Sequence, residues 1–134
     1  FLISEKSNTS DEVFFIDENI SSITKPISLT FSVVNSLSNQ CLKNSKNSTL
    51  DYNKLVFPLV LRKWKNGDSF IPLGMKGYKK VSNYMIDEKM SILQKQNTWV
   101  LCSNGDIICV IGNRIDDRYK LGHQTEKIYL VQPI

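Results

Sequence analysis

The alternation of apolar and polar residues along the chain predicts a protein built mainly of β-strands. VFFID (13–17) and ISLTFSVV (27–34) have the two-residue period of a strand. LVFPLVLRKW (55–64) resumes an extended pattern, and Pro58 within it indicates an edge strand or a break. KIYLVQ (127–132) is predicted to be the last strand. Residues 35–50 are dense in Ser and Asn, and we expect a long loop there.

The segment TWVLCSNGDIICVI (98–111) gives the clearest local prediction, a β-hairpin. Asn104-Gly105 separates two apolar runs, and both residues tolerate the positive φ of a type I′ turn. Pairing about this turn sets Cys102 opposite Ile107, Leu101 opposite Ile108 and Val100 opposite Cys109. Cys102 and Cys109 are then expected to be buried thiols that share one face as diagonal neighbours. The run IICVI is apolar on both faces, so its strand should lie inside the sheet.

Two short helices are predicted between the strands. In VSNYMIDEK, Val81, Tyr84 and Met85 fall at i, i+3 and i+4 on one helical face. SILQKQN (91–97) is a second candidate. The expected fold class is therefore mainly β with one or two short helices packed on a sheet, and α+β is the alternative.

Length and composition fit one globular domain. The chain has 134 residues, 41% of them apolar and 22% charged, and no apolar run approaches the roughly 20 residues of a membrane span. The first residues, FLISEKSNTSDE, are too short and too acidic for a signal peptide, and the absence of an initiating Met suggests a piece of a longer protein. Cys41, Cys102 and Cys109 are an odd number, which favours reduced thiols and a cytoplasmic location. With His123 as the single histidine, no metal site is expected.

The excess positive charge of the chain is concentrated in one stretch. The net charge is +4, whereas residues 62–80 alone carry +5, with Asp68 as their one acidic residue. Trp64, Phe70 and Tyr78 lie among these cations. Basic side chains interleaved with aromatic rings suit an RNA backbone and its bases. A solvated loop with ordinary surface lysines would give the same charge count, so both interpretations stay open.

Glycines in the same stretch suggest a loop that approaches a ligand closely. Gly67, Gly74 and Gly77 permit positive φ, and Lys79-Lys80 follow them. Loop amides together with these lysines would bind an anion. The alternative is a loop that only turns a corner.

No catalytic residues emerge from the sequence. Asp87-Glu88 and Asp116-Asp117 are adjacent pairs, which point in different directions, so surface, capping or arginine-pairing roles explain them better. Ser103-Asn104-Gly105-Asp106 has the look of a phosphate loop but enters a strand instead of a helix.

Many fixed spacings then identify a family. Residues 51–89 read D-Y-x-K-L-x-F-P-L-x-L-R-x-W-x-x-G-D-x-F-x-P-L-G-M-x-G-x-K-K-V-S-x-x-x-I-D-E-K, and residues 112–118 read GNRIDDR. Both motifs resemble the C-terminal domain of bacterial tRNA(Ile)-lysidine synthetases, over roughly residues 51–133. On this division, residues 1–50 form leading strands and a Ser/Asn-rich loop, and residues 51–134 form the tRNA-binding domain.

The resemblance implies a division of labour within a longer enzyme. The full enzyme uses ATP, with Mg, to adenylate the wobble cytidine of the isoleucine tRNA with a CAU anticodon, and free lysine then displaces AMP. That chemistry belongs to an N-terminal domain with a Ser-Gly-Gly-x-Asp-Ser loop, a motif that this chain lacks. The resemblance therefore implies a non-catalytic piece without a cofactor. Its expected partners are tRNA(Ile), gripped chiefly at the acceptor stem, and the enzyme's own N-terminal domain, with a homodimer possible and no membrane or DNA involved. The implied fold is a β-sandwich shared with part of bacterial phenylalanyl-tRNA synthetase.

The motifs also place the expected binding residues. The candidate tRNA contacts are Arg62, Lys65, Lys76, Lys79, Lys80, Arg114 and Arg118. Arg62 and Arg114 have an alternative, internal pairing with Asp68, Asp87 or Asp116. The residues expected to shape the loop are Asp68, Pro72, Gly74 and Gly77, and Trp64 and Phe70 are expected to anchor it. The competing function is a protein-interaction or dimerisation module whose basic loop faces its own catalytic domain, and an independent small enzyme is the third.

Overall fold

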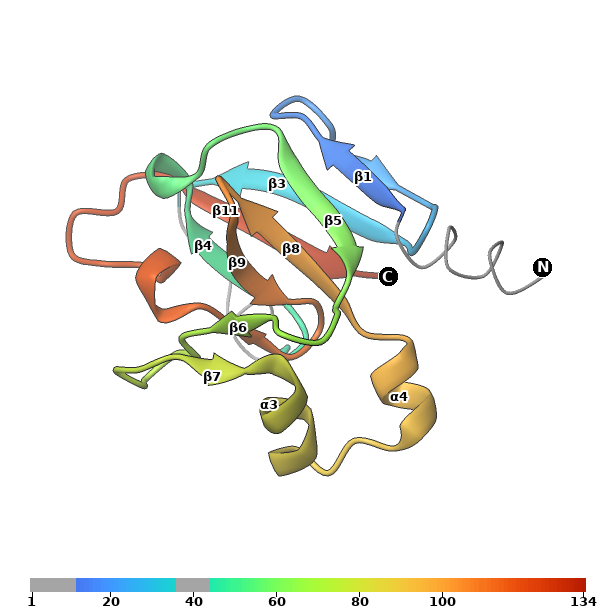
Figure 1. Ribbon diagram of the computed structural model, residues 1–134. Coiled ribbons are helices and arrows are strands. Elements are labelled where there is room, and N and C mark those ends of the chain that lie inside the picture. The colour runs from blue at the N-terminus through green and yellow to red at the C-terminus, as the bar shows by residue number, and fades with distance from the viewer. Residues whose placement is uncertain (1–11, 36–43) are drawn as a thin grey trace.

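Two β-sheets face each other and form the body of the molecule (Figure 1). The computed structural model describes residues 12–35 and 44–134. Cys41 and the first eleven residues lie outside this range, as do the predictions made for them. The mainly β fold class with two short helices is confirmed. No helix in the described part of the chain is long and apolar enough to cross a membrane.

The first sheet has the strand order β1-β5-β8-β9-β10, and all its pairs are antiparallel. Its strands are β1 (Val13–Ile16), β5 (Leu59–Lys63), β8 (Trp99–Ser103), β9 (Asp106–Val110) and β10 (Arg114–Ile115). The strand predicted from IICVI lies inside this sheet, between β8 and β10, as its two apolar faces indicated. Asn104 and Gly105 form the predicted turn, with φ of 51° and 86°.

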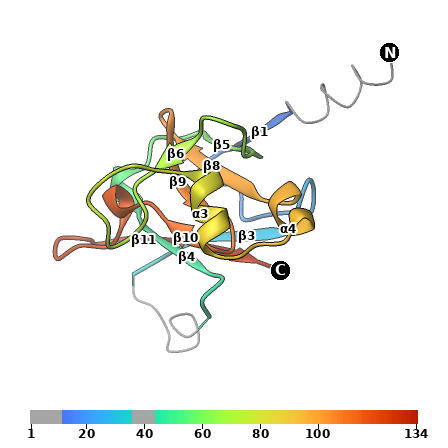
Figure 2. The ribbon, with the colours of Figure 1, turned by 60° about the horizontal axis from the view of Figure 1, so that its bottom comes forward.

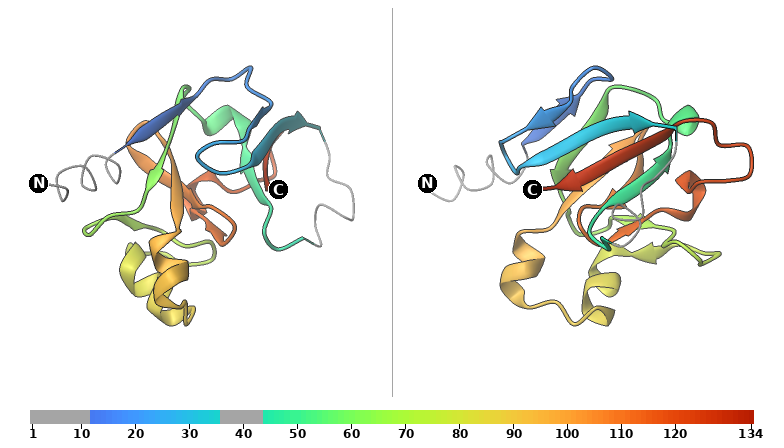
Figure 3. Two further views of the ribbon diagram at one scale, coloured as in Figure 1. Left: turned by 90° about the vertical axis from the view of Figure 1, so that its right-hand side faces the viewer. Right: turned by 180° about the vertical axis from the view of Figure 1, so that it is seen from behind.

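The second sheet has the order β2-β3-β11-β4 and lies behind the first (Figure 3, right). Its strands are β2 (Ser22–Ile23), β3 (Leu29–Val34), β4 (Ser48–Asp51) and β11 (Ile128–Pro133). The chain's last strand pairs with β3 on one side and β4 on the other, which ties the C-terminal segment to the early part of the chain. The prediction of a loop up to residue 50 extended too far, because Ser48 already begins β4. The part of that prediction over residues 36–43 lies outside the described residues.

The core between the two sheets is made of large apolar side chains from both. Leu29 and Leu50 of the second sheet and Leu59, Leu61 and Leu101 of the first are fully buried there. Burying one such side chain contributes about 1.5–3 kcal/mol. Two single-turn 3-10 helices, η1 (Tyr52–Lys54) and η2 (Asp117–Tyr119), connect strands at the edges of this sandwich.

Between β5 and β8 the chain leaves the first sheet and returns to it. Residues 64–98, called the excursion below, contain β6 (Ser69–Phe70), β7 (Lys79–Lys80), α3 (Val81–Asp87) and α4 (Ile92–Gln96). The two helices lie beside each other below the sheets in Figure 1 and come forward in Figure 2. Val81, Tyr84 and Met85, the predicted helical face, are buried and pack with Phe70 against Val100 on the outer face of the first sheet.

The hairpin register differs from the prediction beyond its first pairs. Cys102 lies opposite Ile107 as expected, but Leu101 pairs with Cys109 and Val100 with Val110. A bulge between Leu101 and Cys102 causes the shift, since it adds one residue to one strand of the pair. The prediction that the two thiols share a face was therefore wrong: Cys109 belongs to the core between the sheets, and Cys102 to the core beneath the excursion. Both are buried and free, as predicted.

Pro58 breaks the extended segment and does not mark an edge strand. It precedes β5, which begins at Leu59 and is paired on both sides, with β1 and β8.

Candidate functional site

The basic loop of the excursion, Ile71–Tyr78, is fixed at its base by the segment that follows β10. The Asp116 side chain is fully buried, and one of its oxygens accepts a hydrogen bond from the Ile71 N–H at 2.9 Å. The Asp117 N–H donates to the Ile71 carbonyl at 2.7 Å, and the Leu73 N–H donates to the Ile115 carbonyl at 3.0 Å. Pro72 forms a single bridge with Asp116. The acidic pair of the sequence is thus a structural clamp on the loop.

Gly74 occupies a backbone position that favours glycine. Its φ is +89°, and its N–H donates to an Asp117 carboxylate oxygen at 3.0 Å. This hydrogen bond, together with that from Lys120, lowers the pKa of Asp117. Gly77 has no positive φ, and a Cβ there would meet open space. The backbone therefore requires glycine at position 74 and not at position 77.

Asp68 shapes the turn that precedes β6 and also holds Arg62. One carboxylate oxygen accepts the Lys65 N–H at 2.8 Å. The guanidinium of Arg62 binds the same carboxylate through two nitrogens, at 2.8 and 3.1 Å. The hydrogen bonds that Arg62 donates to Asp68 raise the pKa of Arg62. Arg62 therefore has the internal pairing that the sequence left open.

Arg118 is held by several partners at once. Its guanidinium donates two hydrogen bonds of 3.0 Å to the buried Asp116 and one of 3.0 Å to the Tyr78 hydroxyl, and it lies 3.5 Å from Asp106. The hydrogen bonds to Asp116 raise the pKa of Arg118. Its charge is thus neutralised within the domain.

Lys79 is not free, which corrects the expectation that both Lys79 and Lys80 are solvated. Its ammonium forms an ion pair with Asp87 at the end of α3. Lys80 is the residue before α3 and is exposed. Alternation along the two-residue strand β7 sends the two side chains to opposite sides.

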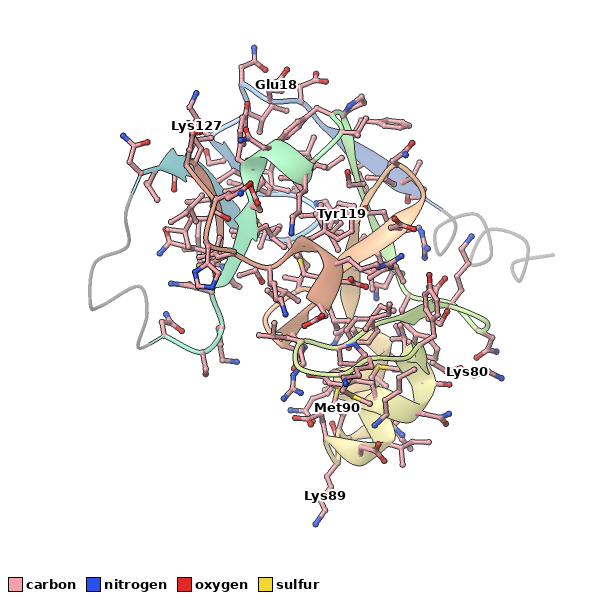
Figure 4. All side chains as sticks on the ribbon, turned by 90° about the vertical axis from the view of Figure 1, so that its left-hand side faces the viewer. Glu18, Lys80, Lys89, Met90, Tyr119 and Lys127 are labelled. Carbon is pink, nitrogen blue, oxygen red and sulfur yellow. The ribbon has the colours of Figure 1, made fainter. Side chains whose placement is uncertain are left out.

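In the part of the chain that the structure describes, four of the seven expected contacts form no ion pair with a carboxylate. Among the described residues, Lys65, Lys76 and Lys80 are exposed lysines of the excursion for which no carboxylate lies within ion-pair distance. Arg114 is also exposed, with its guanidinium 5.8 Å from the centre of the Tyr84 ring. Figure 4 shows Lys80 at the end of the molecule that carries the helices, with Lys127 at the opposite end. The excursion therefore carries three lysines whose positive charge is available to a ligand.

The two aromatic anchors behave as predicted. Phe70 is fully buried and meets Tyr84 edge-on at 5.4 Å. Trp64 is half-buried, and its indole N–H donates to the Lys95 carbonyl at 2.7 Å, which ties the start of the excursion to α4.

A polar cavity beside the loop was not predicted from the sequence. It measures about 360 Å³, is open to solvent, and is lined by the turn at Gly67, the hairpin turn at Gly105 and the residues Tyr78 and Arg118. Arg62, Asp68 and Asp106 also line it. Tyr78 was recognised in the sequence only as one aromatic among the cations. The cavity depends on segments that are far apart in sequence, and no local pattern indicates such contacts.

The described residues contain no group of three His, Cys, Asp or Glu side chains placed to hold a metal ion. The two buried thiols are also poor nucleophiles, because burial raises the pKa of Cys102 and raises that of Cys109 to about 12.

Curated proteins with a similar sequence share one description. The tRNA(Ile)-lysidine synthase of Parabacteroides distasonis is 45% identical over 108 residues, which are 80% of this chain and 25% of that protein. That of Bacteroides thetaiotaomicron is 40% identical over 88 residues, 66% of this chain and 21% of that protein. The chain belongs to the tRNA(Ile)-lysidine synthase family. It spans about a quarter of the length of these lysidine synthases. No family model matches the chain.

Two solved structures have the same fold. A crystal structure of the TilS C-terminal domain superposes with a TM-score of 0.73 at 15% identity, and the match covers 90% of this chain and 95% of that one. An N-terminal fragment of the phenylalanyl-tRNA synthetase β-subunit from Pyrococcus horikoshii superposes with a TM-score of 0.61 at 14% identity, covering 77% of this chain and 38% of that one. The chain therefore has the fold of a lysidine synthase C-terminal domain. A likeness to part of the bacterial phenylalanyl-tRNA synthetase was expected, and the likeness in fold found here is to the Pyrococcus horikoshii enzyme.

Proposed function

We propose that this chain is the tRNA-binding C-terminal domain of a tRNA(Ile)-lysidine synthase. In this role it grips the acceptor stem of the isoleucine tRNA with a CAU anticodon, while the enzyme's N-terminal domain converts the wobble cytidine to lysidine with ATP, Mg and lysine. The proposed location is the cytoplasm. The observation that carries the proposal is the set of uncompensated lysines on the clamped excursion of a chain from this family.

The electrostatics favour contacts with phosphate by Lys65, Lys76 and Lys80. A lysine that neutralises an RNA phosphate releases a bound counterion, and this release drives much of the affinity at low salt. A lysine already paired with a carboxylate has less to gain. Lys79 is therefore a secondary contact in the proposal, as are Arg62 and Arg118, whose main role is to hold the loop. Arg114 remains a candidate because it is exposed.

The proposal assigns the chemistry of the enzyme to its catalytic domain. The carboxylates near the loop already serve as acceptors: Asp116 for Arg118 and Ile71, and Asp117 for Gly74 and Lys120. A carboxylate engaged in this way is not poised as a general acid or base. The partners proposed are thus the tRNA and the enzyme's own N-terminal domain.

A second candidate function is supported by exposed apolar side chains on the helices. Ile86 of α3 and Ile92 and Leu93 of α4 are 58%, 75% and 67% exposed. Exposed apolar surface on a helix is a feature of protein contacts. A protein-interaction or dimerisation module of the same enzyme would use this surface without direct contact with RNA.

A filter-binding titration separates the two functions. The chain is titrated with isoleucine tRNA and, for comparison, elongator methionine tRNA at 50 and 200 mM salt. The proposal predicts binding that weakens steeply with salt, and it predicts similar affinities for the two tRNAs in the isolated domain, because phosphate contacts do not read sequence. Absence of tRNA binding, combined with a molecular mass that rises with concentration, would contradict it and favour the second function.

A further inference from the structure

We propose that the cavity beside Tyr78 is a subsite for one unpaired nucleotide of the bound RNA, whose base stacks on the Tyr78 ring. This inference rests on the proposed function and adds to it. The lysines would hold the phosphates of a duplex, and Tyr78 would hold a base that extends beyond the paired region.

Tyr78 is an exposed aromatic ring that the protein holds in place. Its side chain is 66% exposed, yet its hydroxyl accepts a hydrogen bond from Arg118 at 3.0 Å. The Arg118 guanidinium lies 5.2 Å from the centre of the Tyr78 ring. Arg118 is in turn fixed by the buried Asp116. A ring fixed in this way loses little conformational entropy when a base stacks on its free face.

The charge of the cavity favours a base over a phosphate group. Its two arginines, Arg62 and Arg118, are each paired with a carboxylate, and Asp106 adds a further negative charge at the wall. A phosphate would meet no uncompensated cation there. The exocyclic amines and ring N–H groups of a base, in contrast, are hydrogen-bond donors that suit carboxylates.

The walls also leave room for a flat ligand next to Tyr78. The cavity volume is about 360 Å³, and two of its lining residues, Gly67 and Gly105, have no side chain. A Cβ added to either glycine would meet nothing within 4 Å, so these two turns border open space. Lys76 lies two residues before Tyr78 and is exposed, which places a phosphate contact close to the stacked base.

A double-mutant cycle with chemically altered RNA tests the subsite. Two RNA ligands are compared. The first is a hairpin with a four-nucleotide single-stranded 3′ tail, and the second is the same hairpin with an abasic tail of equal charge. We expect Tyr78→Ala to weaken binding of the first RNA by about 5- to 150-fold, the range given by stacking of one base on an aromatic side chain, and to leave binding of the abasic RNA unchanged. Tyr78→Phe keeps the ring and should lose much less than Tyr78→Ala.

Phe15→Ala is the matched control, because Phe15 on β1 is also an exposed ring, at 62%, and does not line the cavity. It should change neither affinity. An unchanged affinity in Tyr78→Ala, or an equal loss on both RNAs, would overturn the subsite. The proposed tRNA-binding function would survive that result if the wild-type chain still bound tRNA in a salt-dependent way, whereas failure of the wild-type chain to bind either hairpin would overturn both.

Discussion

The sandwich and the excursion share one sheet but use it differently. The inner face of the first sheet packs on the second sheet, and the buried cluster between them consists, among the described residues, of apolar side chains. The outer face carries the excursion, which has a smaller core of its own and holds Lys65, Lys76 and Lys80, three exposed lysines for which no ion pair is found among the described residues. The sandwich therefore supplies stability, and the excursion supplies charge.

The contrast shows how a small domain can present a basic surface without weakening its main core. Self-repulsion among the cations is confined to a segment clamped by Asp116, Asp117 and Asp68. These carboxylates accept hydrogen bonds from backbone N–H groups and from arginines. Lys65, Lys76 and Lys80 therefore stay available to a ligand. The first consequence is a difference in stability between the two regions.

The largest expected effect is the loss of stability when a buried side chain of the sandwich core is truncated. Leu61→Ala should lower the free energy of unfolding by about 2–5 kcal/mol, because Leu61 is fully buried and its removal leaves a cavity. Ile92→Ala on α4 should change it by no more than about 0.5 kcal/mol, because that side chain is 75% exposed. Urea titrations of the two variants measure both values. Equal losses would contradict the division between the regions.

The second-largest loss of stability should come from breaking the clamp that Asp116 and Asp117 form on the loop. Asp116→Ala should cost about 2–3 kcal/mol, since it removes a buried acceptor from Ile71 and from Arg118, which is itself partly solvated. It should also release the loop, so hydrogen exchange at the amides of residues 71–78 should become faster than in wild type. Asp117→Asn, which keeps an oxygen acceptor for Gly74, is the control and should leave exchange at Ile71 slow. Unchanged exchange in Asp116→Ala would mean that the loop is held by other contacts.

Alkaline pH should weaken the sandwich through groups whose pKa is raised on folding. Burial raises the pKa of the Cys109 thiol from 9.0 to about 12, and burial with a hydrogen bond to Asp106 raises that of Tyr119 from 10.0 to about 12. A raised pKa stabilises the folded state below the unfolded value, and this stabilisation is lost as the pH rises toward the folded value. The melting temperature should therefore fall between about pH 9 and pH 12. A flat profile over that window would contradict the burial of Cys109.

Thiol reactivity checks the same burial by an independent route. In a Cys41→Ser background, both Cys102 and Cys109 should react with a thiol reagent only after unfolding, because burial keeps them protonated and inaccessible. Fast labelling of either thiol in the native chain would contradict this prediction.

A structural feature was predictable from the sequence when the residues that cause it lie close together in the chain. The Asn104-Gly105 turn and the Val81-Tyr84-Met85 face were predicted because both arise within a few residues. The bulge at Leu101 was not, because it depends on contacts on both sides of the sheet, and it moved Cys102 and Cys109 to opposite faces. At the candidate site, the stretch of lysines was visible in the sequence. The pairing of Lys79 with Asp87 and the cavity at Tyr78 were not, since each joins segments brought together by the fold.

Only small effects on stability are expected from the two adjacent lysines of β7, Lys79 and Lys80. Lys79→Ala breaks a partly exposed ion pair with Asp87, which is worth no more than about 1 kcal/mol. Lys80→Ala breaks no ion pair and should leave the melting temperature unchanged, yet it should weaken RNA binding more than Lys79→Ala does. The reverse order of affinities would show that the pair with Asp87 opens when RNA binds.

The salt dependence of tRNA binding tests the central claim most directly. Replacing Lys65, Lys76 and Lys80 together with Ala should flatten the slope of log K against log salt by up to about 2.7, since each phosphate neutralised contributes about 0.9. A second triple variant, Lys25→Ala with Lys54→Ala and Lys127→Ala, removes the same charge from exposed positions on the sandwich and should leave the slope nearly unchanged. Equal slopes for the two triple variants would contradict the account, because RNA binding would then follow net charge and not the excursion.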